Sequence, residues 1–269
     1  MVEIFQNIRK IYDFRKPCQE LIDYIEFYSQ SNSAASDDID KKGFSSVKMF
    51  PSWTPTIYIN LGPSYYIDLN NKRYNIKKDD DILILRNGDV TRHKQASDNL
   101  FTIKFQPGGL ERILGFNQIF IVDQIINLNH ILPQILIKQL KQQITFEERV
   151  LLIESYLLEA FNHRNNGDHY LKIVRDCIVE YQGAGMQLNT TQVAERIFIT
   201  SKTINRYFNR VIGTSPKAFL SILRSRNALT AFVANKAHFN PLDYGYYDLS
   251  HFHKDIVSLT GKSLKKHNI

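Results

Sequence analysis

Cysteine and long apolar runs are scarce in this sequence, and each shortage excludes a class of protein. The 269 residues include one Trp and two Cys, Cys18 and Cys177. Two cysteines so far apart predict neither a disulfide framework nor a cysteine-rich metal site, so we expect reduced, buried thiols. No uninterrupted apolar run approaches the ~20 residues of a membrane-spanning helix. The first residues, MVEIFQNIRKIYDF, also lack the apolar core of a secretion signal, so we expect a soluble cytoplasmic protein without membrane contact.

The motifs of several enzyme classes are missing as well. The sequence has no nucleophile elbow, no phosphate-binding glycine loop and no cysteine-centred catalytic set. A metal-binding barrel needs several histidines and a carboxylate, but only His93 lies in the part with strand periodicity. Because His93 stands between Arg92 and Lys94, we place it on a polar loop. His251 and His253, two residues apart, point in different directions on a helix and form no chelating pair. We therefore expect no enzyme, no cofactor and no metal.

Negative charge is scarce in one part of the chain only. Residues 171–269 carry 14 Lys and Arg against 6 Asp and Glu, whereas residues 1–170 carry 20 against 21. A basic segment suits the binding of a polyanion, because neutralised phosphates release counterions and that release favours association. A basic surface that only keeps the protein soluble explains the charge equally well.

A change in apolar periodicity along the chain indicates an α+β protein. A helical pattern over about residues 19–28 is followed by a polar segment, residues 29–42, which we expect to be a mobile surface loop. From about residue 44 to residue 107 apolar residues recur at every second position, as in strands, and Asn70-Asn71 suits a hairpin turn. Short strands of this kind predict an antiparallel sandwich or barrel. The helical period returns at Gly109, with longer candidate helices at residues 133–144 and 146–163.

Residues 193–213, VAERIFITSKTINRYFNRVIG, have the layout of a helix-turn-helix. Thr200 suits the N-cap of the second helix, and Gly213 suits a left-handed residue at its C-terminal end. One side of this helix has a regularly spaced apolar stripe of Ile204, Tyr207, Phe208, Val211 and Ile212. The other side carries hydrogen-bonding side chains that can contact base edges or phosphates: Lys202, Thr203, Asn205, Arg206, Asn209 and Arg210. An ordinary amphipathic surface helix has the same periodicity, so this helix alone does not decide between the two.

Followed to its end, the C-terminal region resembles the DNA-binding domain of the AraC family of bacterial transcription regulators, over about residues 188–267. In the first helix-turn-helix, the positions of the family's core, charge and cap residues are occupied by Val193, Ala194, Ile204, Arg206, Phe208 and Gly213. Ser215-Pro216 can then start the family's long connecting helix. The most specific match is GYYDLSHFHKDIVSLTG, residues 245–261. The resemblance implies two helix-turn-helix units, with base-contacting positions at Lys202, Asn205, Arg206, Leu249, Ser250, His253 and Lys254.

One departure from the family lies at Pro241. The second unit of the family begins with a full helix, whereas this chain has KAHFNPLDYG there. Proline lacks an amide donor and clashes with the preceding turn, so we expect a one-turn helix capped by Asn240 with Pro241 at its first position. The second unit is therefore expected to dock less firmly, and most base discrimination is assigned to the first recognition helix.

The N-terminal part resembles, more loosely, the cupin-like sensor half of the same family, on PSWTP, the hairpins and FQPGG. We predict a sensor or dimerisation domain at residues 1–163, a linker and leading helix at 164–187, and the DNA-binding domain at 188–269. The predicted function is sequence-specific DNA-binding transcription regulation. Candidate partners are double-stranded DNA, a small-molecule effector in the N-terminal domain, a second copy of the chain and RNA polymerase.

Two other classes of protein remain open. The first is a small-molecule-binding protein whose DNA-binding half has degenerated into an interaction module, which would give no specific DNA footprint. The second is an enzyme acting on a ligand in the barrel, which would need converging titratable groups.

Overall fold

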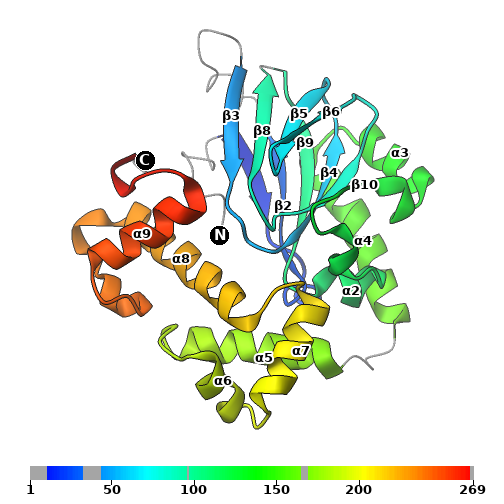
Figure 1. Cartoon of the computed structure of the whole chain (residues 1–269). Coiled ribbons are helices and arrows are strands. Elements are labelled where there is room, and N and C mark those ends of the chain that lie inside the picture. Colours follow the sequence, from blue (N-terminus) through cyan, green and yellow to red (C-terminus); the bar gives the residue numbers. More distant parts are fainter. Residues whose placement is uncertain (1–10, 33–43, 96, 165–168, 267–269) are drawn as a thin grey trace. The chain divides into compact units, whose positions relative to one another are not determined.

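The computed structural model describes residues 11–32, 44–95, 97–164 and 169–266. They form two compact units, which are treated separately below. The first contains two antiparallel sheets and the helices packed on one of them, and the second, which comprises Phe50–Ser52 and the residues from 169 onward, is mainly helical (Figure 1). The predicted α+β class is confirmed. In the described ranges no helix combines the length and apolar character needed to cross a membrane.

The first unit is a β-sandwich. Its larger sheet has the order β1 (Tyr12–Arg15), β2 (Ile25–Ser31), β9 (Leu100–Phe105), β4 (Pro55–Asn60), β7 (Ile82–Leu85) and β10 (Ile125–Asn127). Its smaller sheet has the order β3 (Phe44–Met49), β8 (Val90–Gln95), β5 (Tyr65–Leu69) and β6 (Lys72–Ile76). The predicted antiparallel sandwich over residues 44–107 is confirmed, and β1, β2 and β10 extend it beyond those limits.

The larger sheet is buried on both faces. Along β4, Ile57 and Ile59 pack with the helices, while Tyr58 between them belongs to the cluster that joins the two sheets. Every residue of β4, β7 and β9 is buried, and this double burial explains why most of them are apolar. The helices on the outer face are α2 (Gly109–Leu114), α3 (Gln134–Gln142) and α4 (Phe146–His163), with the 3₁₀ turns η2 (Gln118–Ile121) and η3 (Leu128–His130) between them.

The longer helices that the sequence predicted in this unit are confirmed. Helix α4 begins at a capping box, in which Thr145 and Glu148 satisfy each other's backbone amides. Its apolar stripe, which includes Val150, Ile153 and Leu157, is buried in the core of its own unit.

The prediction of a helix at residues 19–28 is wrong. Residues 19–24 form turns, with the Leu21 amide donating to the Cys18 carbonyl at 3.1 Å. From Ile25 the chain is β2, paired with β1 and β9. The local period suggested a helix, but pairing with β9, some 70 residues later in the chain, decides the conformation. The polar segment 29–42 begins inside β2, and its part from residue 33 lies outside the described residues.

The hairpin at Asn70-Asn71 is confirmed. Both residues have positive φ, 48° and 66°, and they join β5 to β6. Two successive left-handed residues match the right-handed twist of the strands, and Asn tolerates that conformation better than most residues.

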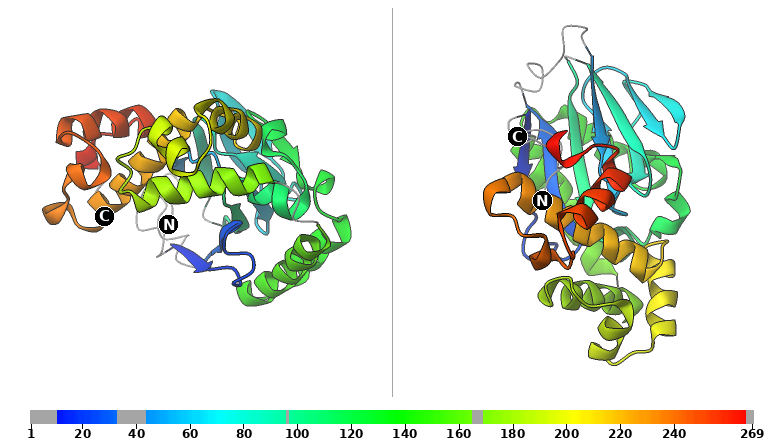
Figure 2. Two further views of the ribbon diagram at one scale, coloured as in Figure 1. Left: turned by 90° about the horizontal axis from the view of Figure 1, so that it is seen from below. Right: turned by 60° about the vertical axis from the view of Figure 1, so that its left-hand side comes forward.

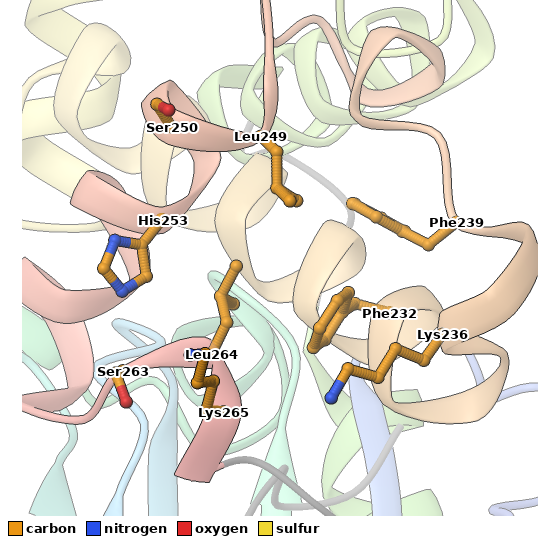
Figure 3. Close-up of a pocket in the computed structure, with 9 residues that line it drawn as sticks. All are labelled: Phe232, Lys236, Phe239, Leu249, Ser250, His253, Ser263, Leu264 and Lys265. Atoms are coloured by element: carbon orange, nitrogen blue, oxygen red, sulfur yellow. The ribbon is translucent and has the colours of Figure 1, made fainter.

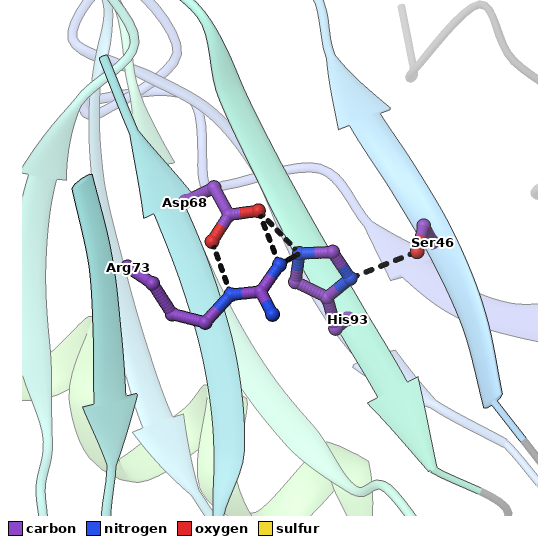
Figure 4. A network of polar contacts seen from close by, with 4 residues as sticks. All are labelled: Ser46, Asp68, Arg73 and His93. Atoms are coloured by element: carbon purple, nitrogen blue, oxygen red, sulfur yellow. Dashed lines mark hydrogen bonds and ion pairs between the residues drawn. The ribbon is translucent and has the colours of Figure 1, made fainter. Parts of the chain in front are cut away.

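The placement of His93 on a loop is wrong, because His93 lies in β8 between β3 and β5. Its Nε2 is 2.7 Å from Asp68 Oδ2, and its Nδ1 is 2.9 Å from Ser46 Oγ (Figure 4). Arg73 completes this network with two hydrogen bonds to Asp68, at 2.7 and 2.8 Å. Arg73 and His93 together hold the pKa of Asp68 well below its usual range. The network joins strands of the smaller sheet on its outer face.

The second unit contains α5 (His169–Gly183), α6 (Thr190–Arg196), α7 (Ser201–Val211), α8 (Pro216–Ala234) and α9 (Leu249–Thr260), with the 3₁₀ turns η4 (Lys236–His238), η5 (Pro241–Tyr244) and η6 (Leu264–Lys266). Helix α8 runs between two helical groups, with α5, α6 and α7 at its start and α9 near its end (Figures 1 and 2). As predicted, Ser215 caps α8 and Pro216 occupies its first turn.

Both cysteines are free thiols. Cys177 is buried as expected, and burial raises its pKa to about 12. Cys18 is only partly buried, so the expectation of two buried thiols holds for Cys177 alone.

Candidate nucleic-acid interface

The turn between α6 and α7 is tight and well hydrogen-bonded. The Ile199 amide donates to the Ala194 carbonyl at 3.0 Å, and the Phe198 amide donates to the Glu195 carbonyl at 3.1 Å. Phe198 is left-handed, with φ of 59°, and the residue is 95% exposed. A bulky residue is unusual in this conformation, and no pattern in the sequence singled out Phe198.

Helix α7 has two faces of different chemistry, as its sequence predicted. Thr200 caps it by accepting a hydrogen bond from the Thr203 amide at 3.1 Å. Ile204, Phe208 and Val211 are buried, and after the helix Gly213 has φ of 93°. The opposite face exposes most of the predicted contact residues: Lys202, Asn205, Arg206, Asn209 and Arg210. Thr203 is half-buried, with its hydroxyl 3.0 Å from that of Thr200.

An aromatic cluster of His169, Tyr170 and Tyr207 supports the two arginines of α7. The guanidinium of Arg206 lies 4.9 Å from the centre of the Tyr207 ring and donates to the Tyr207 hydroxyl at 3.2 Å. The guanidinium of Arg210 lies 4.2 Å from the centre of the Tyr170 ring and donates to the Tyr170 hydroxyl at 2.8 Å. His169 Nε2 is 2.9 Å from the Tyr207 hydroxyl. These contacts restrict both arginine side chains at the surface.

The sequence missed this cluster because α5 fell within the segment assigned to a linker and leading helix. The buried residues of α5 recur at helical spacing, at Leu171, Val174, Cys177 and Tyr181. That stripe was a usable sign that α5 packs against the helix-turn-helix. Which exposed side chains of α5 would reach α7 depends on the crossing of the two helices, which a single sequence does not encode.

The second helix-turn-helix begins as predicted around Pro241. A single turn of 3₁₀ helix, η5, starts at Pro241, and the Asn240 side chain caps it by accepting from the Leu242 amide at 3.2 Å. Gly245 ends it with φ of 69°, and a Cβ there would lie 2.8 Å from the Met186 carbonyl oxygen. Only glycine therefore fits at residue 245 without a shift of the backbone.

Helix α9 is capped by Asp248, which accepts from the His251 amide at 2.7 Å. Phe252 and Ile256 are buried on one side. The residues predicted to contact bases are all exposed on this helix: Leu249, Ser250, His253 and Lys254. The structure thus brings four predicted residues together on α9 and a separate group on α7.

Arg224 of α8 joins α9 to the connecting helix. Its Nη2 donates to Asp255 at 3.1 Å, and its guanidinium lies 4.4 Å from the centre of the Tyr246 ring. Tyr246 is buried, with its hydroxyl 2.8 Å from Ser225 Oγ. His251 packs on Tyr246 edge to face, with ring centroids 5.0 Å apart. These contacts give His251 a packing role.

Comparison with known proteins gives a likeness in fold. No protein-family model matches the chain, and no curated protein matches it. Among solved structures the chain is similar to ToxT from Vibrio cholerae O395, with 11% identity and a TM-score of 0.47, covering 84% of this chain and 98% of that chain. It is also similar to the AraC-like transcriptional activator CuxR, with 12% identity and a TM-score of 0.26, covering 88% of this chain and 90% of that chain. These values describe general fold alone.

Proposed function

We propose that this protein is a sequence-specific DNA-binding transcription regulator. The observation that carries the proposal is the outer face of α7, where Asn205, Arg206 and Arg210 are exposed opposite the buried stripe. An α-helix fits the major groove of DNA, where Arg pairs with guanine and Asn with adenine. Helix α7 is the second helix of a tight helix-turn-helix, which is the helix that such motifs place in the groove.

Phosphate contacts and base contacts are assigned to different groups of the protein. Lys and Arg side chains, together with backbone amides at helix starts, hold the protein on phosphates and fix its register. Lys202, Asn205 and Arg206 then discriminate between bases, each good contact contributing ~1 to 3 kcal/mol. Thr203 is assigned a supporting role, because it is half-buried and bonded to the N-cap residue. Arg210, at the far end of α7, is assigned to a phosphate or base at the edge of the site.

Helix α9 is proposed to enter a second major groove on the same face of the DNA, about 34 Å from the first. Ser250, His253 and Lys254 can donate to phosphates or base edges, whereas Leu249 offers only an apolar contact such as a thymine methyl group. The second helix-turn-helix is therefore proposed to contribute more to DNA affinity than to discrimination between bases.

The first unit is proposed to hold a small polar effector between its sheets. Polar side chains from both sheets are buried there. Arg92 of β8 bonds to Asp98 and to the Tyr12 hydroxyl, and Tyr58 of β4 accepts from Arg86 at 2.7 Å. Tyr65 of β5 is buried in the same hydrophobic cluster as Tyr58, and the centre of its ring lies 5.9 Å from the Arg92 guanidinium. Binding could change DNA affinity only if the ligand distinguishes two states of the protein. A saturating ligand screen without any thermal shift or change in DNA binding would contradict this part.

The experiment that tests the main proposal is selection of bound DNA from a random pool at physiological salt. We expect an enriched motif about two helical turns long, as two reading helices per chain require. Enrichment of no motif would contradict sequence-specific binding and would favour the interaction module that the sequence left open. A motif of one helical turn would assign base readout to a single helix, and α7 variants would identify it.

A further inference from the structure

A pocket inside the second unit lies beside the start of α9, next to residues that the proposed function assigns to DNA. Its volume is about 690 Å³. That volume falls within the ~300 to 1,000 Å³ typical of sites for small molecules. The walls come from the end of α8, the segment after it, the first turns of α9 and residues around η6.

The interior of the pocket is apolar and aromatic. Phe232 and Phe239 meet edge to face, with ring centroids 5.3 Å apart and an interplanar angle of 88°. Leu249 is 52% exposed and Leu264 is buried, and all four side chains surround one space (Figure 3). Two perpendicular rings and two leucines provide flat and aliphatic surfaces, which suit a planar hydrophobic group.

Positive charge borders this apolar space. Lys236 and Lys265 line the pocket, and Lys236 Nζ lies 5.4 Å from the centre of the Phe232 ring. The remaining polar members of the lining are Ser250, His253 and Ser263, so no described lining residue carries a carboxylate. A ligand with an apolar body and a negative end matches both features.

We propose that this pocket binds a small aromatic carboxylate. Its ring lies among Phe232, Phe239 and Leu249, and its carboxylate faces Lys236 and Lys265. This site is separate from the polar effector site proposed between the sheets, and it lies within the DNA-binding unit itself. Ser250 and His253 form part of its wall, so the ligand and DNA compete for the same surface of α9. The competition rests on the proposed function, whereas binding of the ligand does not.

The direct test is calorimetric titration of the full chain with biphenyl-4-carboxylate in the absence of DNA. We expect one site and an affinity at least about tenfold lower in Leu249→Trp, because the larger side chain fills the pocket. Val257→Trp is the matched control, since Val257 is also exposed on α9 but lies outside the lining. It should bind the acid like the wild type. Circular dichroism and thermal melting of both variants establish that they fold.

The charge requirement is tested with a second pair of variants and an uncharged ligand. Lys236→Ala with Lys265→Ala should weaken binding of the acid about three- to tenfold, because each exposed charge contributes modestly. Lys172→Ala with Lys217→Ala makes the same charge change outside the lining and should leave the affinity unchanged. Biphenyl-4-methanol should bind the wild type more weakly than the acid does. The difference in affinity should be about the same three- to tenfold factor by which the Lys236→Ala and Lys265→Ala double variant binds the acid more weakly than the wild type.

Several results would overturn the site: no binding of the acid, equal binding by Leu249→Trp and wild type, or equal binding of acid and alcohol. The competition is measured separately, on DNA recovered by selection, where the acid should weaken DNA binding by wild type but much less by Leu249→Trp. If no DNA is recovered, the proposed regulator function fails while calorimetry still decides whether the pocket binds the acid. If the acid binds at the pocket and DNA affinity does not change, competition is refuted.

Discussion

The arginines of α7 are supported by the rings and hydroxyl groups of two tyrosines. Tyr207 accepts from Arg206 through its hydroxyl, and its ring lies beneath the guanidinium. Such a contact restricts the side chain without neutralising its charge, so less conformational entropy is lost when Arg206 binds DNA. The same argument applies to Arg210 on Tyr170.

Replacing Arg206 with Ala should weaken binding to the selected DNA site by about 1 to 3 kcal/mol, with a much smaller loss on random DNA. The reason is that a base contact contributes only at the matching sequence. Fluorescence anisotropy with the selected duplex and a scrambled duplex measures both. Tyr207→Phe, which removes only the supporting hydroxyl, should cost less than Arg206→Ala. An equal loss on both duplexes would identify Arg206 as a phosphate contact.

Asp68 gives a residue-scale prediction in the first unit. Its folded-state pKa is lowered by Arg73 and His93, so the ion-pair network stabilises the fold above the unfolded pKa of about 4 and loses this effect as the pH falls below it. Asp68→Asn should reduce the free energy of unfolding by about 1 kcal/mol or less near neutral pH, since the network is partly exposed.

Urea unfolding at neutral pH and below pH ~4 measures this difference, which should shrink in acid. Asp79→Asn is the control, because Asp79 is exposed and lies outside the network. A difference between wild type and Asp68→Asn that is unchanged or larger in acid would refute the role of the charge.

At the scale of elements, the sequence identified those whose ends and faces are encoded locally. Thr200 and Ser215 predicted where α7 and α8 begin, and Pro241 predicted the short η5 turn. Residues 19–28 were assigned wrongly, because β2 is fixed by pairing with β9 far along the chain. The aromatic support of α7 was missed for a similar reason, since Tyr170 reaches Arg210 only when α5 and α7 are packed together.

The turn before α9 should be intolerant of any side chain at residue 245. Gly245→Ala combines a positive φ with a Cβ only 2.8 Å from the Met186 carbonyl, so we expect a loss of about 1 to 3 kcal/mol in stability. Gly183→Ala is the matched control, because a Cβ at residue 183 meets nothing within 4 Å. Thermal melting of the two variants should separate them clearly. Equal melting temperatures would contradict the strain argument.

At the scale of the whole molecule, net positive charge is confined to the C-terminal segment. Residues 171–269 carry 14 Lys and Arg against 6 Asp and Glu, so phosphate contacts should come from that segment. DNA affinity should fall linearly with salt on logarithmic axes, with a slope of about −0.9 per phosphate neutralised.

A pair of lysine variants tests where this slope originates. Lys254 on α9 is proposed to contribute to affinity more than to base discrimination, so Lys254→Ala should reduce the slope by about 1. Lys78→Ala, a change at an exposed lysine of the first unit, should leave the slope unchanged. Titrations of the full chain at several salt concentrations measure the slopes. DNA binding that does not depend on salt would contradict the proposed function.

The strand order of the larger sheet has a further consequence for the time course of folding. Its β2–β9 pair joins Ile25–Ser31 to Leu100–Phe105, so the sheet cannot be completed until segments some 70 residues apart have met. The helical unit is built from neighbours along the chain, and proteins dominated by local contacts fold faster than those that depend on distant pairing. The chain's single tryptophan, Trp53, belongs to the sandwich unit. During refolding from urea, much of the helical circular dichroism should therefore return before the tryptophan emission does.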